Sequence, residues 1–168
     1  MNKLFLSTLA SILFCSSVWA ELDLRAEHEI TIICEQLLAD YAIYRDHLEA
    51  ENFANIFTQD AHFVPGSGLV RGRENIKKYI EDHATPAHLI MFTSSQIDAQ
   101  SETRASGLAY AVILNGDRQV LEGDRPIQMN GITAASEYRA EFERTEEGWK
   151  ISKLELKGLF RGPGAVQQ

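Results

Sequence analysis

The period of the apolar residues changes once along this sequence, and that change limits the folds that the chain can adopt. From Leu24 to His47, apolar side chains recur every three or four residues, which predicts one long amphipathic helix. After His88 the period becomes two, which is typical of strands. The pattern predicts further helices at 51–58 and 73–83, a short strand at 61–64, and long strands at 88–99, 104–114, 132–145 and 149–160. Helices followed by a run of strands favour an α+β fold with an antiparallel sheet.

The first twenty residues predict export. Lys3 precedes a mostly apolar run, and Val18-Trp19-Ala20 places small residues where a signal peptidase cleaves. The run is shorter than the ~20 residues that span a bilayer. We therefore expect a signal peptide at 1–20, one α+β domain at 21–160 and a flexible tail at 161–168. The mature protein would be secreted or periplasmic, with no membrane attachment after cleavage.

Charge and motifs argue against several classes of function. The formal net charge is −8, and lysines and arginines are scattered, so no basic patch for nucleic acid is visible. No His-Glu-x-x-His, Gly-x-Ser-x-Gly or phosphate-binding glycine loop occurs. We expect neither a metal nor an organic cofactor. Cys34 stands alone once Cys15 leaves with the signal peptide, and we interpret it as a small buried hydrophobe.

Two ionisable residues are candidates for chemistry. His88 shares a strand face with Ile90 and Phe92, where an imidazole could accept a proton near neutral pH or could simply be a core histidine bonded to a carbonyl. Asp46 ends the long helix away from its main apolar stripe. Its carboxylate faces solvent if the helix buries a narrow stripe, or faces inward if Leu38, Ala42 and Asp46 form a second buried edge. Spacing alone leaves both questions open.

The segment 115–131 has no clear period and contains four glycine and proline residues. A loop of this length in a compact domain is usually functional or mobile. We expect it to cover the mouth of a pocket as a lid, and a disordered insertion is the alternative.

Several short patterns, taken in order, resemble the SnoaL-like branch of the nuclear transport factor 2-like superfamily. They are Tyr41-x-x-x-x-Asp46, Phe53-x-x-x-Phe57-Thr-x-Asp60-Ala61-x-Phe63, Gly72-Arg73-Glu74-x-Ile76, His88, and Tyr138-x-x-Glu141-Phe142-x-Arg144 leading into Gly148-Trp149-Lys150-Ile151. The resemblance implies a cone-like fold in which N-terminal helices pack on a curved, mainly antiparallel sheet that encloses a pocket.

Within the superfamily, the pattern is most similar to scytalone dehydratase and hexachlorocyclohexane dehydrochlorinase. The resemblance implies that His88 is a general base and that Asp46 orients it. It implies a cofactor-independent lyase or isomerase that takes a proton from carbon of a small apolar or cyclic substrate. A non-catalytic exported small-molecule-binding protein is the alternative. The expected substrate-binding residues are Arg144, Tyr138, Phe63, Tyr41 and Phe92.

The resemblance also implies a homodimer that pairs through the outer face of the sheet. Leu108, Tyr110 and Val112 share one face of the strand at 104–114, while mostly alanines occupy the other. Two apolar faces on one strand suggest that both are covered.

Overall fold

The computed structural model describes residues 22–83, 88–116 and 129–162, and for His88 and Asn130 it describes the backbone alone. The helices of these stretches are α1 (Leu24–His47), α2 (Ala50–Asn55) and α3 (Arg73–Asp82). The strands are β1 (Phe57–Val64), β2 (Val70–Arg71), β3 (His88–Ser101), β4 (Arg104–Gly116), β5 (Met129–Thr145) and β6 (Gly148–Arg161). None of the described helices is long and apolar enough to cross a membrane.

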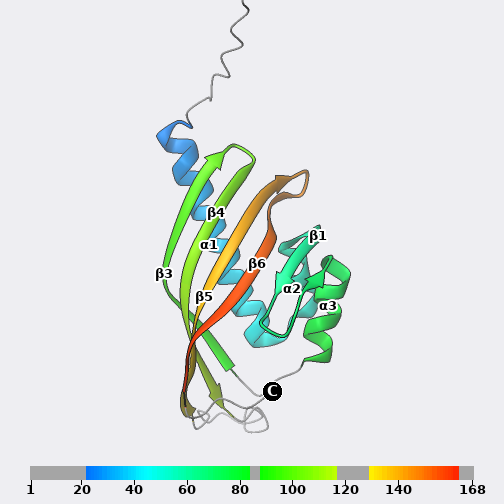
Figure 1. Cartoon of the computed structure of the whole chain (residues 1–168). Helices are drawn as coiled ribbons and strands as arrows, with labels where there is room; N and C mark the ends of the chain where they lie inside the picture. The colour runs from blue at the N-terminus through cyan, green and yellow to red at the C-terminus, as the bar shows by residue number, and fades with distance from the viewer. Residues whose placement is uncertain (1–21, 84–87, 117–128, 163–168) are drawn as a thin grey trace, which may run out of the picture.

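The strands form one sheet in the order β2-β1-β6-β5-β4-β3. Neighbouring strands are antiparallel except β1 and β6, which run parallel, so the sheet is mixed and stays open. The long strands β3–β6 curve across α1, while α2 and α3 lie beside β1 and β2 (Figure 1). The predicted α+β fold is therefore confirmed, with one parallel pair added to the expected antiparallel sheet.

The structure corrects two local predictions. The second helix ends at Asn55, and residues that were expected to continue it start β1, because Phe57 pairs with Ile151 of β6. Sheet pairing here overrides the local helical pattern. The strand β2 was not predicted, since it has two residues and too few positions to show a period.

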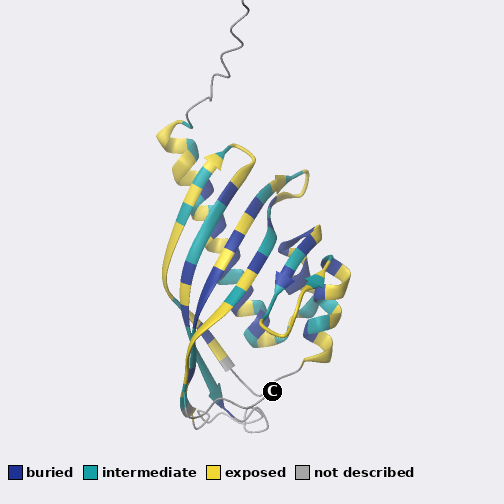
Figure 2. Ribbon diagram, viewed as in Figure 1, coloured by how far each residue is buried: buried dark blue, intermediate teal, exposed yellow. Residues whose placement is uncertain are grey.

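The long helix α1 begins and ends with local signals. The side chain of Asp23 accepts hydrogen bonds from the backbone N–H groups of Arg25 (2.8 Å) and Ala26 (2.9 Å), which caps the N-terminus. Leu48 adopts a left-handed conformation with φ 56° and stops the helix. Between these ends, α1 buries one side against the sheet, through Ile30, Cys34, Leu37, Leu38, Tyr41 and Ala42. Figure 2 shows the long strands alternating between buried and exposed positions, as strands with one covered face do.

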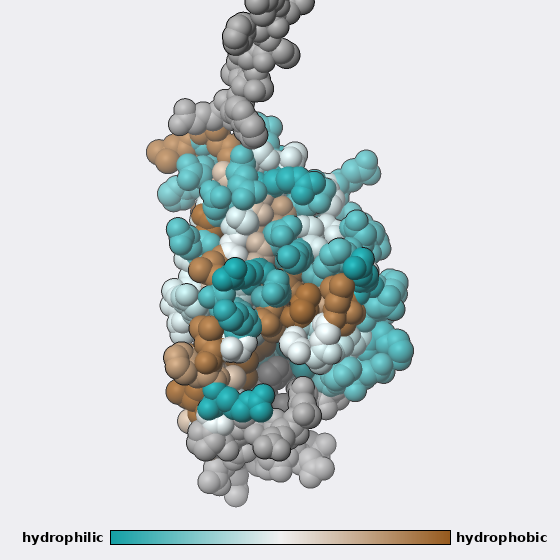
Figure 3. Space-filling view, in the orientation of Figure 1, coloured by the Kyte–Doolittle hydropathy of each residue, from teal (hydrophilic) through white to brown (hydrophobic). Residues whose placement is uncertain are grey.

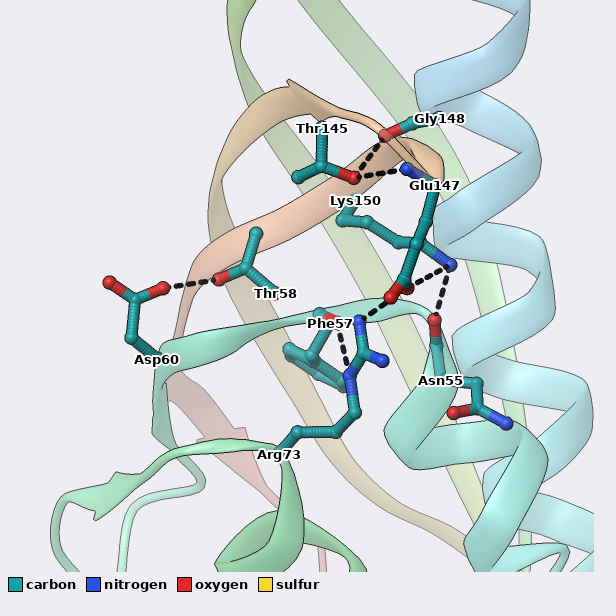
Figure 4. Close-up of polar contacts among 9 residues, drawn as sticks. All are labelled: Asn55, Phe57, Thr58, Asp60, Arg73, Thr145, Glu147, Gly148 and Lys150. Carbon is teal, nitrogen blue, oxygen red and sulfur yellow. Dashed lines mark hydrogen bonds and ion pairs between the residues drawn. The ribbon is translucent and has the colours of Figure 1, made fainter.

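A buried arginine joins α3 to the sheet. Nε and Nη2 of Arg73 donate to the backbone carbonyl of Phe57 at 2.9 and 2.6 Å, and Nη2 also contacts Glu147 Oε2 at 2.9 Å (Figure 4). Lys150 donates to the carbonyl of Asn55 at 2.7 Å beside it. These contacts fasten the start of β1 to the β5–β6 hairpin, which explains the position of Arg73 in the Gly72-Arg73-Glu74 pattern.

The outer face of the sheet carries an apolar patch. We call Leu89, Met91, Tyr110 and Ile132 the outer patch; all four side chains are at least 40% exposed. Leu89 pairs with Leu114, and Leu114 pairs with Ile132, so the patch continues across three strands. Figure 3 shows apolar side chains gathered along the lower part of the long strands. The opposite face of β4 is buried through Ala105, Ala109 and Ala111.

Replacing Arg73 should destabilise the fold. Arg73→Met leaves the Phe57 carbonyl without its charged donors, and a hydrogen bond to a charged group contributes about 1.5–3 kcal/mol. We expect urea unfolding to show a loss of about 2–3 kcal/mol. As a control, Lys78→Met removes an exposed pair with Asp82 and should change stability by less than about 0.5 kcal/mol. Equal effects of the two variants would contradict the role of Arg73.

The outer patch also makes the expected homodimer testable. Met91→Glu together with Ile132→Glu would place charges on that face and should turn a dimer into a monomer in light scattering. Ile32→Glu is the matched control, because Ile32 is 60% exposed on α1 and away from the sheet face. If the wild-type protein is a monomer at micromolar concentration, the predicted homodimer is wrong.

Candidate active site

Asp46, at the end of α1, points toward the sheet. Its Oδ2 accepts a hydrogen bond from the backbone N–H of Ile90 on β3 at 3.0 Å, and its Oδ1 is shielded from solvent. Leu38 and Ala42 are buried as well, at 3% and 7% exposure. The second of the two alternatives for α1 is therefore the correct one, and the helix buries a broad surface that ends in a carboxylate.

The histidine of the predicted pair begins β3. The backbone of His88 pairs with Asn115, and the pairing continues without a bulge to Ile90, opposite Ile113. His88 and Ile90 are thus two positions apart on one strand face, a rise of about 7 Å. The side chain of His88 lies outside the described part of the structure, so its predicted role stays a prediction.

Tyr41 and three other predicted binding residues come together. The ring of Tyr41 lies 6.3 Å from Phe63, 6.5 Å from Phe92 and 5.7 Å from Tyr138, between ring centroids. Phe92 and Tyr138 are 5.1 Å apart. Tyr41, Phe63 and Tyr138 are at most 2% exposed, while Phe92 is half-buried. These rings form one apolar wall between α1 and the sheet, and all except Phe92 are also part of the core.

A second charged residue, Arg45, which was not predicted, precedes Asp46 in α1. Arg45 is buried, with 9% exposure, and its Nη2 lies 3.4 Å from the carbonyl oxygen of His83, after the end of α3. Arg45 follows Tyr41 by four residues, so both lie on one side of α1. That spacing was the available signal, but an arginine in a helix is more often solvated.

The two tyrosines stay neutral in this setting. Burial raises the pKa of Tyr41 and of Tyr138 well above the usual value of a phenol. The negative charge of Asp46 raises the pKa of Tyr138 further, whereas the positive charge of Arg45 lowers the pKa of both. Neutral hydroxyls can donate and accept hydrogen bonds but do not serve as bases near pH 7.

Arg144 does not join this group. It is exposed, pairs with Trp149 next to the β5–β6 turn, and is six residues from Tyr138 along β5, about 20 Å for an extended strand. Strand alternation puts both residues on one face of β5, but that face extends past the end of the site. The structure therefore gives no support to Arg144 as a pocket residue.

The predicted lid, 115–131, is described only at its two ends. Residues 117–128 are outside the described residues. The flanking positions are described: Asn115 pairs with His88, and Gly116 pairs with Met129. These flanking residues therefore lie at the end of the sheet where β3 begins. Figure 3 shows the surface hollowed in its lower half, between the long strands and the side of α2 and α3.

The described residues offer no site for a metal ion or for a reactive thiol. Among the described residues, no group of three or more His, Cys, Asp or Glu side chains could hold a metal ion. Cys34 is fully buried in the core, and burial raises the pKa of its thiol to about 12.

The comparisons with known proteins agree with this architecture. The model of the SnoaL-like domain matches residues 24–155. The chain belongs to the SnoaL-like family. Among curated proteins, none matches the sequence.

Several solved structures of other proteins share the fold of this SnoaL-like protein. A candidate scytalone dehydratase from Novosphingobium aromaticivorans has a TM-score of 0.66 and 21% identity, over 83% of this chain and 90% of the other. The hexachlorocyclohexane dehydrochlorinase LinA-type3 from Novosphingobium barchaimii has a TM-score of 0.66 and 21% identity, over 81% and 90%. A protein of unknown function with a cystatin-like fold from Nostoc punctiforme has a TM-score of 0.63 and 14% identity, over 80% and 92%. At these identities the likeness concerns the fold.

The burial of Cys34 makes a direct prediction. Thiol reagents attack the thiolate, and a raised pKa leaves almost none at pH 8. We expect Ellman's reagent to label the mature protein at pH 8 only after a denaturant is added. Labelling of the native protein at the rate of free cysteine would contradict the buried position.

Proposed function

We propose that this protein is an exported, cofactor-independent lyase or isomerase that removes a proton from carbon of a small apolar or cyclic substrate. His88 would be the base and Asp46 the residue that orients it. One observation carries the proposal: the carboxylate of Asp46 is turned inward and fixed by the N–H of Ile90, two strand positions from His88.

Asp46 suits an orienting role. Its hydrogen bond to the main chain of β3 fixes the carboxylate relative to the strand that carries His88. A fixed carboxylate can hold one ring nitrogen of a histidine, set its tautomer and stabilise the imidazolium that forms. The same bond would also be useful in a purely structural connection between α1 and β3, so activity must decide between the two.

The proposed reaction needs few groups. His88 accepts the proton from carbon, and the electron pair left behind forms a double bond. In an elimination the leaving group departs with its own electron pair. In an isomerisation, the imidazolium returns the proton to another carbon. A general base typically contributes about 10²–10⁴ in rate.

The buried aromatic residues of the site suit a proton transfer. Tyr41, Phe63 and Tyr138 are themselves buried, and low dielectric strengthens electrostatic interactions. Dehydratases and dehydrochlorinases among proteins of the same fold are consistent with cofactor-free lyase chemistry.

The alternative is an exported binding protein with the same site and no chemistry. It is favoured by the predicted signal peptide, which suits a scavenging role, and by the close packing of the rings around Tyr41. The two functions differ in whether a bound compound exchanges a carbon-bound proton.

The test starts from a screen of small cyclic ketones, alcohols, halides and acids, first by thermal shift and then by NMR in deuterated buffer. We expect at least one ligand to incorporate deuterium or eliminate. His88→Gln should lower that rate by about 10²–10⁴, and Asp46→Asn by about 10²-fold or more, since a wrong tautomer impairs the base.

Two matched controls define the outcome. His47→Gln and Asp82→Asn replace exposed residues of the same types and should keep near wild-type rates. Full activity in His88→Gln would rule out His88 as the base. Tight binding without exchange in any variant would favour the binding protein.

A further inference from the structure

A buried serine on the inner face of the sheet has no role in the proposed proton transfer. Ser136 precedes Tyr138 by two positions on β5, and the ring of Tyr138 packs on Tyr41 of α1, so both side chains point toward the helix. Ser136 is only 7% exposed. Its hydroxyl forms no hydrogen bond with another described residue. Because burying a hydroxyl is costly without a hydrogen bond, its position calls for a partner.

The residues beside Ser136 on the neighbouring strands are small. Ser136 pairs with Ala111 on β4 and with Gly158 on β6, and Ala111 pairs in turn with Phe92 on β3. These residues form one row across the inner face, in which Phe92 lies about 10 Å from Ser136, or two strand spacings. A Cβ placed on Gly158 would meet no described atom within 4 Å. The serine therefore has open space beside it on the β6 side.

This space can be reached from outside. The pairing of β1 with β6 ends at Glu155, so Gly158 lies beyond the part of β6 that β1 flanks. Gly158 is exposed, whereas Ser136 next to it is buried. A small molecule can thus pass over Gly158, where no side chain stands in the way, and reach the hydroxyl.

The row of Ser136 lies next to the row that holds Asp46. Ile90, whose N–H binds Asp46, pairs with Ile113, and Ile113 pairs with Ala134, two positions before Ser136. A ligand at Ser136 is therefore on the same face of the sheet as the candidate dyad, and one row away from it.

A serine hydroxyl in an apolar wall favours a ligand with an acceptor oxygen. It can donate a hydrogen bond to a carbonyl oxygen, whereas a hydrocarbon or a halide would leave it without a good acceptor. When a base removes the proton from the carbon beside a carbonyl, the electron pair moves onto the oxygen. A donor already placed at that oxygen stabilises the charge as it develops.

We propose that Ser136 donates a hydrogen bond to the carbonyl oxygen of a cyclic ketone, whose ring lies over Ala111 and against Phe92. The inference rests on the proposed function, since it names the substrate class of the same site. The ketone enters over Gly158, and the carbon beside its carbonyl faces the start of β3.

The test compares cyclic ketones with their exocyclic methylene analogues, which have the same shape but no acceptor oxygen. In NMR titrations of the mature protein at pH 7, at least one ketone should bind about 2–10-fold tighter than its analogue, the effect of one neutral hydrogen bond. Ser136→Ala should bring the two affinities together, and Ser136→Thr should retain a preference. Ser106→Ala is the matched control, because Ser106 lies on the outer face of β4 and its Oγ accepts from Gln100.

The open space at Gly158 is tested separately. Gly158→Val fills it with a side chain and should weaken the binding of every ketone, with little change in melting temperature, because no described atom is in the way. Lys157→Val is its control: it makes the same addition to β6 one residue earlier, on the outer face, and should not affect binding.

Three results would overturn the proposal. They are equal affinities for ketone and analogue in every pair with the wild-type protein, no binding of any ketone at millimolar concentration, and Ser136→Ala with its preference intact. The last would make Ser136 a core serine without a ligand. If Ser136→Ala does not fold, Ser136→Cys, which keeps the size and weakens the donor, takes its place in the same comparison.

Binding and catalysis can be told apart. His88→Gln should keep the preference for the ketone, because it leaves Ser136 in place. If the preference is present but no protein exchanges deuterium, the lyase function is wrong and the ketone site stands. If exchange occurs without any preference, the ketone site is wrong and the proton transfer stands. Where both are found, Ser136→Ala should slow exchange at saturating ketone, since the hydrogen bond strengthens in the transition state.

Discussion

The packing of α1 across the sheet, centred on the ring of Tyr41, is the contact on which the rest of the structure depends. Tyr41 meets Phe53 of α2, Phe63 of β1, Phe92 of β3 and Tyr138 of β5, with ring centroids 5.0–6.5 Å apart. One side chain thus joins four elements that are distant in the sequence. Aromatic pairs at such distances add to the free energy of burial, and they set the distance between helix and strands.

That packing creates a sharp boundary between apolar and polar groups. Four and five residues beyond Tyr41, α1 carries Arg45 and Asp46, which lie at the edge of the aromatic cluster. Ionised groups in such a place are costly unless they have partners. The main-chain N–H of Ile90 and the carbonyl of His83 supply polar contacts for them. The core and the candidate site are therefore two parts of one layer, and a change in the rings would move the charges.

The structural roles of the charged residues differ more than their sequence context suggests. Arg73, Arg45 and Arg144 all occur in segments with clear periodicity. Arg73 fastens the β5–β6 hairpin to β1, Arg45 lies in the candidate site, and Arg144 is exposed beside that hairpin. Strand alternation puts Arg144 on the same face of β5 as Tyr138. It could not tell where along that face the site ends, because alternation carries no information about depth.

The sequence by itself determined the order and type of the main elements, since a period of 3.6 or two depends only on which side of each element is buried. The bounds of α1 and the start of β3 followed from that pattern. Only the tertiary structure decided the parallel pairing of Phe57 with Ile151, the inward direction of Asp46 and the burial of Arg45. Each of these depends on a partner far away in the chain, and contacts between distant segments leave no period in either one.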